Sequence, residues 1–575
     1  MSSLAQLPPS HTLNQTQKPL EQWNSDELIR TYLRSSTEPM APADPVLLRT
    51  RLQMFRVRMF EIERLRLNLR PASSDVFDRE LAAIMYKRKI LLWFSFPIRD
   101  LPDEILAIIF RYVVWSSNGA DQATQHRLWL TWVCRRFRAI ALSDATLWNS
   151  VWFRDSPPWT RSFTFIERAS TATLDLRIDE KIGPEGTAHD VPPKYPPITV
   201  PQIKELLKIL GPKVGQIRIL VVVLSDMEVV EAFMEGLSKA GPLSAMERIE
   251  VHRTSQPYLW PKEKSEGSGG YLPLSEQPTP KLRWLSLNGV TTNWNALQPS
   301  NLRTIDLRRM SVQACPTSER WSEILKLSPD LFKLSLDAAG PQLDPRRQRI
   351  GTGARPIDLP CLRDLTIGDM SCLYAAHVLA HMHAPRVMSL SLMSLTGQDY
   401  GPLTEMLKGR FREIRMLQLQ GFEVGKTDVN MQRAVAWFES MSRLKLLKFS
   451  RVKPYLLDAL LADPRDYRPG EMDTRPADGK DDKRPVVCPE LDTVHFNTQG
   501  PTDMSTFAKG RKDLGVMLKR AYALEAFLKT LKKEEDTRIR ENVAELVPMK
   551  FIQMTREEDS IYEEMANSLG VVRRR

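Results

Sequence analysis

The clearest metal-binding chemistry lies in three closely spaced histidines, His377, His381 and His383, which follow Cys372. Histidines four residues apart lie one helical turn apart, and imidazole nitrogen and thiolate sulfur are ligands that zinc prefers. The segment lacks the glutamate of the HExxH pattern, however, and its apolar spacing is that of an ordinary helix. The sequence therefore favours a structural helix, and we expect no metal and no other cofactor.

Two further features could suggest catalysis. Gly267, Gly269 and Gly270 form a glycine-rich run, but it lies in a linker between Ser and Pro residues and matches no phosphate-binding loop. Cys134 lies on an apolar helix face, which predicts a buried and unreactive thiol. We find no active site in the sequence and expect a protein that is not an enzyme.

The composition is that of a globular protein. The 575 residues are 42% hydrophobic and 26% charged and suffice for two to four domains. The five cysteines include no CxxC pair, which favours a reducing compartment over a disulfide framework. No apolar run approaches the roughly 20 residues that span a bilayer, and no secretory signal is present. We expect an intracellular protein of the cytoplasm or nucleus that has no membrane partner.

In the first third of the chain, two short apolar helices are expected, and any binding residues there would lie on them. Pro102, followed by Asp103 and Glu104, is typical of a helix start, because proline needs no donor there and acids complement the positive helix end. A second helix is expected after a polar break at 116–125. Helices this short cannot bury their apolar stripes against each other alone. Either the rest of this protein or a partner must cover them.

The residues Leu-Pro-Asp-Glu-Ile-Leu at 101–106, Val-Cys-Arg-Arg-Phe-Arg at 133–138 and Leu-Trp at 147–148 resemble an F-box. The chain is similar to the large fungal, basidiomycete-type family of F-box proteins with degenerate leucine-rich repeats. It departs from that pattern at Phe137, where many members have Trp, and in a longer loop at 115–127. The resemblance implies that a Skp-type linker protein binds here and attaches the chain to a cullin-RING ubiquitin ligase. It assigns linker binding to Leu101, Pro102, Ile105, Leu106, Ile109, Phe110, Leu130, Val133, Cys134, Phe137, Ile140, Leu147 and Trp148.

The segments around this motif differ in character. Residues 1–48 are poor in apolar side chains, which predicts disorder. Residues 49–95 predict two amphipathic helices that lead into the F-box at 96–153; the first has a basic face and an apolar stripe that ends at Pro71. The basic face could touch membrane or nucleic acid. A solvated face, with the stripe packed on the F-box or a partner, is the preferred interpretation.

A repeated LxxLxL pattern dominates the rest of the chain. Strong copies begin at Leu282, Leu302, Leu331, Leu362, Val387, Ile414, Leu444 and Leu491, and weaker copies at Ile217 and Met246. Helical apolar spacing lies between many of the copies. One strand and one helix per unit predict an α/β fold, with a parallel sheet inside and helices outside. The pattern resembles an irregular leucine-rich-repeat solenoid, placed at 165–500.

The predicted solenoid differs from a regular leucine-rich-repeat solenoid in three ways. Insertions rich in Pro, Gly or charge, near 181–201, 255–280 and 463–489, are expected to be disordered. Residues 501–575 predict a helical cap and tail, with heptad-like spacing from Leu514 to Leu531. The family's turn position, normally Asn or Cys, is apolar here, so we expect apolar packing to hold the turns. These positions are Val290, Met310, Ala339, Met370, Leu395, Phe422 and Val452.

Side chains alternate across a strand, so each copy directs a row of residues away from the core. This row contains exposed Trp and Met, which interfaces enrich, and we predict that it binds a protein substrate. Its members are Trp284, Ser286, Asp306, Arg308, Lys333, Asp364, Met393, Met416, Gln418 and Lys448. A second row consists of basic residues that directly follow the first apolar residue of a copy, and it could form a basic stripe for an acidic ligand. We favour the interpretation in which their alkyl chains cover the sheet edge and their charges stay hydrated. The row comprises Arg218, Arg283, Arg303, Arg363, Arg415 and Lys445.

The preferred function is a substrate-recognition adaptor of a Skp-cullin-F-box ubiquitin ligase. The alternative is a leucine-rich-repeat scaffold that uses the helical hairpin for another partner, outside ubiquitin ligation. A third hypothesis is nucleic-acid binding through residues 51–70. The lack of interleaved basic and aromatic residues there argues against nucleic acid as a partner.

Overall fold

The computed structural model describes residues 45–67, 75–95, 101–153, 155–180, 197–254, 274, 279–290, 292–298, 301–343, 356–468, 484–497, 499–550 and 554–568. Nearly all of the predicted disordered N-terminus, most of the predicted insertions and the glycine-rich run lie outside these residues. The chain divides into two compact units, Met1–Ser116 with Leu130–Ala141, and Ser117–Trp129 with Leu142–Arg575.

The first unit contains two packed helices, α2 (Pro45–Leu67) and α3 (Asp75–Ser95). Ile62 of the predicted stripe is completely buried, and Arg58 forms a 2.8 Å ion pair with Glu80. The structure describes α2 as far as Leu67, and the end predicted at Pro71 lies outside the described residues. The stripe predicted to pack on the F-box or a partner therefore has α3 as its neighbour.

The F-box-like segment forms α4 (Asp103–Trp115), α5 (Ala120–Val133) and α6 (Arg135–Ser143). Pro102 precedes α4, as predicted, and Asp103 lies in its first turn. The predicted second helix is divided in two at Cys134. This cysteine is exposed because it lies at the break between two helices, so the prediction of a buried thiol is wrong. Arg136 of α6 forms a 2.6 Å ion pair with Asp103.

The second unit is built on one sheet of fourteen parallel strands in nearly sequential order. The strands are β1 (Ser150–Phe153), β2 (Leu174–Asp179), β3 (Ile217–Leu224), β4 (Arg248–Arg253), β5 (Trp284–Asn288), β6 (Thr304–Arg308), β7 (Lys333–Asp337), β9 (Asp364–Gly368), β11 (Ser389–Leu395), β12 (Met416–Phe422), β13 (Leu446–Ser450), β14 (Thr493–Phe496), β15 (Leu518–Leu524) and β16 (Val543–Met549). The short strands β8 (Ile357–Asp358) and β10 (Met382–His383) form a separate pair. All strong and weak LxxLxL copies lie on or directly before strands β3 to β14, and their anchors are buried. The predicted α/β class and parallel sheet are confirmed.

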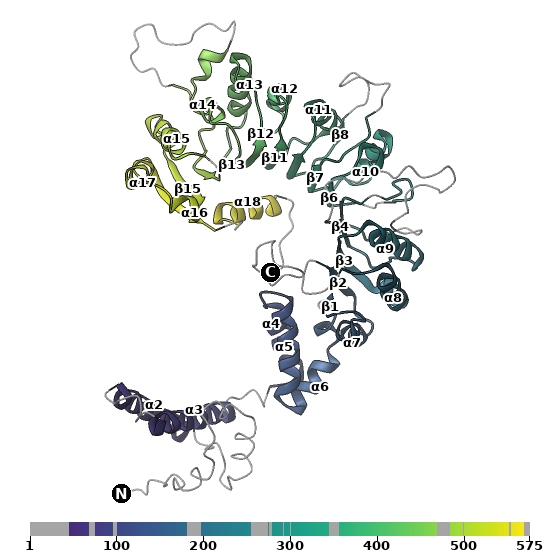
Figure 1. Ribbon diagram of the computed structural model, residues 1–575, viewed down its shortest axis with the longest axis vertical. Helices are drawn as coiled ribbons and strands as arrows, with labels where there is room; N and C mark the ends of the chain where they lie inside the picture. The colour runs from purple at the N-terminus through teal and green to yellow at the C-terminus, as the bar shows by residue number, and fades with distance from the viewer. Residues whose placement is uncertain are drawn as a thin grey trace. The chain divides into compact units, whose positions relative to one another are not determined.

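Helices connect the strands on the outer side of the sheet, and the core lies between the two layers (Figure 1). The connecting helices are α7 (Thr160–Arg168), α8 (Val200–Leu210), α9 (Met227–Lys239), α10 (Ser318–Lys326), α11 (Cys372–Ala380), α12 (Gly401–Leu407), α13 (Asp428–Glu439), α14 (Tyr455–Ala459), α15 (Pro501–Asp513), α16 (Glu525–Leu528) and α17 (Lys533–Arg540). The last helix, α18 (Arg556–Asn567), lies on the inner side of the arc that the strands follow (Figure 1). Strands and helices that alternate in this way are consistent with a solenoid-like repeat.

The turns after the strands are held by apolar side chains, as predicted. All seven apolar residues at the turn position are buried. Each is preceded by a residue with positive φ, namely Gly289, Arg309, Ala338, Asp369, Ser394, Gly421 and Arg451. Only two of these are glycine, although an L-residue at positive φ is strained. Burial of the next side chain therefore offsets a backbone cost in most repeats.

The C-terminal region differs from the prediction. The spacing from Leu514 to Leu531 predicts a helix, but β15 forms there and pairs with β14 and β16. The open edge of β14 offers unpaired backbone groups, and a strand satisfies them where a helix cannot. The insertion predicted at 463–489 is also shorter, because η8 (Pro464–Tyr467) and the buried Cys488 belong to the fold.

Candidate functional site

The ten residues predicted to bind a substrate lie on one face of the sheet. Trp284 pairs with Thr304, which pairs with Lys333, and Ser286 pairs with Asp306. The same register continues through β9, β11, β12 and β13. The predicted strand alternation is therefore correct. We call this face, opposite the connecting helices, the concave face.

The concave face is not evenly accessible. Arg308 is exposed, and five of the ten residues are half-buried: Trp284, Lys333, Met393, Gln418 and Lys448. The other four are buried: Ser286, Asp306, Asp364 and Met416. Part of this burial comes from α18, which the sequence did not predict on this face.

Acidic residues of α18 pair with basic residues of the sheet. Glu558 lies 2.5 Å from Lys448 Nζ, and the carboxylate of Glu564 lies 3.2 Å from Arg415 Nε. Lys448 belongs to β13, and Arg415 directly precedes β12. Charge complementarity thus holds α18 across the second half of the concave face.

Apolar contacts fill the space between these ion pairs. Ile561 of α18 packs with Met416 and Leu446 in one buried cluster, and Tyr562 packs against it. Met416 and Lys448, which we predicted to contact a substrate, therefore contact α18 instead. The amphipathic, acidic α18 complements this part of the sheet in both shape and charge.

The second predicted row is the set of basic residues whose charges were expected to stay hydrated at the sheet edge. This prediction is wrong at two positions. Arg363 is buried and donates to Ser568 Oγ at 2.8 Å, and Arg415 is buried beside Glu564. Burial lowers the pKa of Arg363. Arg283, Arg303 and Lys445 are exposed, in agreement with the prediction. The two corrected arginines belong to the contact with α18.

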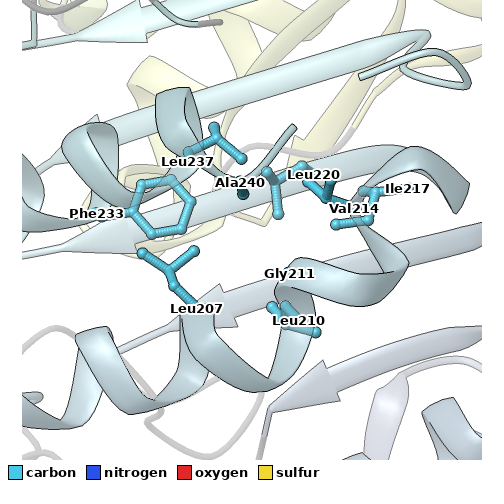
Figure 2. A pocket seen from close by; sticks show the side chains of 9 residues that line it. All are labelled: Leu207, Leu210, Gly211, Val214, Ile217, Leu220, Phe233, Leu237 and Ala240. Atoms are coloured by element: carbon cyan, nitrogen blue, oxygen red, sulfur yellow. The ribbon is translucent and has the colours of Figure 1, made fainter. Parts of the chain in front are cut away.

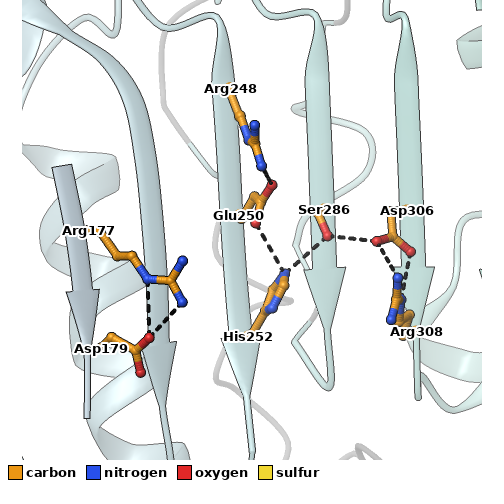
Figure 3. Close-up of polar contacts among 8 residues, drawn as sticks. All are labelled: Arg177, Asp179, Arg248, Glu250, His252, Ser286, Asp306 and Arg308. Atoms are coloured by element: carbon orange, nitrogen blue, oxygen red, sulfur yellow. Dashed lines mark hydrogen bonds and ion pairs between the residues drawn. The ribbon is translucent and has the colours of Figure 1, made fainter. Parts of the chain in front are cut away.

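The first half of the concave face carries a connected polar network on β4, β5 and β6 (Figure 3). Arg248 forms a 2.6 Å ion pair with Glu250, and His252 Nε2 lies 3.1 Å from Ser286 Oγ. Ser286 Oγ in turn donates to Asp306 at 3.2 Å. The network links three neighbouring strands and holds its side chains in fixed positions.

Two further pairs flank this network (Figure 3). Arg308 contacts Asp306 at 2.8 Å on β6, and Arg177 contacts Asp179 at 2.7 Å on β2. Two tryptophans lie beneath guanidinium groups: Arg248 is 4.1 Å from the Trp284 ring centroid, and Arg177 is 4.7 Å from that of Trp152. A guanidinium that stacks on an aromatic ring keeps its edge free to bind a carboxylate.

Burial sets the charge state of this network. It lowers the pKa of His252, and the nearby carboxylates of Glu250 and Asp306 only partly oppose it. Burial alone would lower the pKa of Arg308, but its hydrogen bonds with Asp306, together with the negative charges of Asp306, Asp337 and Glu250, outweigh burial and raise the pKa. At neutral pH the imidazole of His252 is therefore neutral, and the guanidinium of Arg308 keeps its charge.

The predicted substrate-binding row does not include the polar residues of β2 and β4. Leu174 to Asp179 alternates apolar and polar side chains, which is a strand signal on its own. Arg248, Glu250 and His252 lie on a copy that we counted only as weak. Strict alternation would have found both strands where the LxxLxL pattern did not emphasise them.

The predicted linker-binding residues fall into two groups. Six are buried within this chain and have a packing role in this structure: Leu106, Phe110, Leu130, Ile140, Leu147 and Trp148. Seven are half-buried or exposed: Leu101, Pro102, Ile105, Ile109, Val133, Cys134 and Phe137. Only the second group can reach a partner without a conformational change.

A wide, open hollow of about 710 Å³ along α2 and a small cavity in the second unit lie in the described part of the chain. A cavity of about 10 Å³ between α8, η6 (Gly211–Gln216), α9 and β3 has apolar walls and is about the size of one water molecule (Figure 2). Its lining includes Leu207, Val214 and Phe233. It belongs to the packing between the helices and the sheet.

The described residues also include no group of His, Cys, Asp and Glu side chains that could hold a metal ion. His381 Nδ1 lies 2.8 Å from the carbonyl oxygen of His377. His377 lies in α11, and His381 directly follows that helix. None of the helices described here is long and apolar enough to cross a bilayer.

No protein-family model and no curated protein sequence matches this chain. The observations that bear on function are therefore the motif residues and the geometry of the exposed surfaces.

Proposed function

We propose that this chain is a non-catalytic substrate-recognition adaptor of a Skp-cullin-F-box ubiquitin ligase. The helices α4 to α6 bind a Skp-type linker protein and, through it, a cullin-RING ligase. The solenoid, as a degenerate leucine-rich-repeat domain, binds a protein substrate on its concave face. Two separate surfaces thus perform two separate binding functions.

The observation that carries this proposal is that α4 is apolar on two opposite faces. One face is buried and consists of Leu106, Phe110 and Val114. The other face is at least 37% exposed at each position and consists of Ile105, Ile108, Ile109 and Tyr112. A helix that is apolar all round is normally covered on every side, and a contiguous exposed apolar patch marks an interaction surface. The second face of α4 includes two of the residues that the F-box resemblance assigns to the linker.

The mechanism needs no chemistry from this chain. A substrate held on the concave face is brought near an activated ubiquitin on the same complex. Holding two reactants together raises their effective concentration, which suffices to direct ubiquitin transfer to that substrate.

The test is co-purification of a Skp-type linker with the full chain. Ile105→Asp with Ile109→Asp should abolish binding, because an unpaired carboxylate in an apolar interface costs several kcal/mol. Both side chains are exposed at 42% and 37%, so the fold should persist. The matched control is Ile209→Asp with Leu327→Asp, two apolar residues exposed on or beside solenoid helices. Undiminished linker binding by the α4 variant, or equal loss in the control, would contradict the proposal.

A further inference from the structure

A second stretch of the concave face repeats the pattern that α18 covers. Strand β3 places Ile219, Val221 and Val223 on this face, and each is half-buried. In the sheet register, Val221 lies between Arg177 of β2 and Glu250 of β4. An apolar strip thus runs between charged strands on both sides.

The cations of this stretch point outward more than their acidic partners do. The exposed fractions of the basic and acidic side chains are 36% and 19% for Arg177–Asp179, 38% and 11% for Arg248–Glu250, 44% and 11% for Arg308–Asp306, and 35% and 5% for Lys333–Asp364. An approaching molecule therefore meets guanidinium and ammonium groups first. The four paired carboxylates lie beneath the cations and fix them in place, whereas Asp337 of β7, on the same face, is half-buried.

The contact with α18 shows what such a surface can bind. There the apolar residues Met416 and Leu446 lie beside Lys448 and Arg415. The helix α18 supplies Ile561 to the apolar part and glutamates to the cations. Among the described residues, the polar contacts of α18 extend from β15 to the residue before β9, whereas the four cations from β2 to β7 keep exposed fractions of 35% to 44%.

We infer that the concave face over β2 to β7 binds an amphipathic acidic helix of a partner protein. Its apolar side chains pack on the β3 strip, and its carboxylates bind Arg177, Arg248, Arg308 and Lys333. Charged hydrogen bonds to a guanidinium edge held on a tryptophan are well directed. This inference rests on the proposed function where it identifies that helix as part of the substrate, and it then defines the substrate class.

The test is fluorescence anisotropy with the full chain and a labelled peptide of residues 554–568 as an acidic amphipathic probe. The comparison peptide carries Glu→Gln at 557, 558, 563 and 564. We expect the acidic peptide to bind at least tenfold more tightly than the comparison peptide and to weaken with added salt. In the chain, Arg177→Gln with Arg248→Gln should weaken binding at least tenfold. Arg177→Lys with Arg248→Lys should retain most of it.

The control variant is Arg415→Gln with Lys448→Gln, which changes the surface that α18 already covers and should leave peptide binding unchanged. No binding, equal binding of both peptides, or loss only in this control would overturn the inference. The last result would mean that the peptide exchanges with α18. If the Arg→Gln variant does not fold, the inference is still tested with the unmodified chain, by comparing its affinity for the two peptides and by measuring how salt changes the affinity for the acidic one. Linker co-purification is measured separately, so failure of this inference is distinct from failure of the proposed adaptor function.

Discussion

Lys448, His495 and Glu558 meet where α18 lies on β13 and β14. His495 is completely buried, and its ring centroid lies 4.6 Å from that of Tyr522. Burial, aided by the charge of Lys448, lowers the pKa of His495 to about 4, against the opposing effect of the acidic residues Glu558 and Glu557. Burial would raise the pKa of Glu558, but the hydrogen bonds from Lys448 and from the Thr555 backbone, together with the charge of Lys448, outweigh burial and lower the pKa. At neutral pH the imidazole is neutral and the ion pair is intact.

This arrangement predicts a loss of stability in acid. His495 has a pKa near 6.5 when unfolded and about 4 when folded, so the unfolded state binds more protons between these values. The stabilising contribution is therefore complete above pH 6.5 and decreases as the pH falls toward 4, by about 1.4 kcal/mol per unit of pKa difference. The measurement is thermal denaturation at pH 7.5 and pH 5. His495→Phe should reduce the difference between the two melting temperatures.

The control for this prediction is His383→Phe, because His383 is exposed. It should leave the pH dependence of the melting temperature unchanged. Identical pH dependence in the wild type and in His495→Phe would show that His495 does not carry this effect.

Among the elements, α18 differs most from its predicted role, because it lies on the concave face and not at the end of the solenoid as a cap. Thr555 and Glu558 form a capping box at its start, with Thr555 Oγ1 3.4 Å from the Glu558 backbone nitrogen. The helix is therefore locally stable at its N-terminus, and its side chains attach it to the sheet. Its apolar contact with the sheet includes Ile561, which is buried in the cluster with Met416 and Leu446.

Ile561→Asp should detach α18 without unfolding the sheet. The substitution places a carboxylate in an apolar contact, which costs several kcal/mol when unpaired. Hydrogen exchange followed by mass spectrometry should show lost amide protection in 556–567 and new exposure around Met416. Ser560→Asp adds the same charge at an exposed neighbour and should leave protection intact. Protection of 556–567 in Ile561→Asp, or equal loss in both variants, would contradict this account of α18.

The elements also show how far the sequence can predict this fold. The LxxLxL pattern predicted the strands of the large sheet from β3 to β14, but not β8 and β10, because each copy carries its own buried anchors and needs no information about distant residues. Strand β15 was predicted as a helix because Leu514, Met517, Ala521 and Leu524 recur at helical spacing. Its strand state depends on pairing with β14, which local spacing does not record. The capping box of α18 is readable from the sequence, but its position on the concave face is not.

For the candidate site, the sequence predicted which residues share a face but not which of them are accessible. Strand alternation correctly placed the predicted substrate-binding residues on one face. It could not show that α18 covers Met416 and Lys448, or that Arg177 and Arg248 remain accessible. On α4 the sequence predicted one apolar stripe, whereas the structure separates the buried Leu106 and Phe110 from the exposed Ile105 and Ile109. Which side of a uniformly apolar helix is covered depends on its neighbours in space.

The molecule as a whole is proposed to carry two binding functions on two separate sets of residues. The apolar face of α4 is the proposed site for a linker protein, and the concave face over β2 to β7 is the proposed site for an acidic partner helix. The formal net charge of +11 is compatible with an acidic partner but does not define one. Because the two sets share no residues, each function should be removable without the other.

The most direct test is affinity purification of the full chain from cells with the proteasome inhibited, followed by mass spectrometry. The wild type is compared with Ile105→Asp/Ile109→Asp and with Arg177→Gln/Arg248→Gln. We predict that the wild type recovers a Skp-type linker, a cullin and further proteins. The first variant should lose the linker and cullin and keep the further proteins, and the second should do the reverse. A wild-type preparation without linker and cullin, or loss of the same proteins from both variants, would contradict the account.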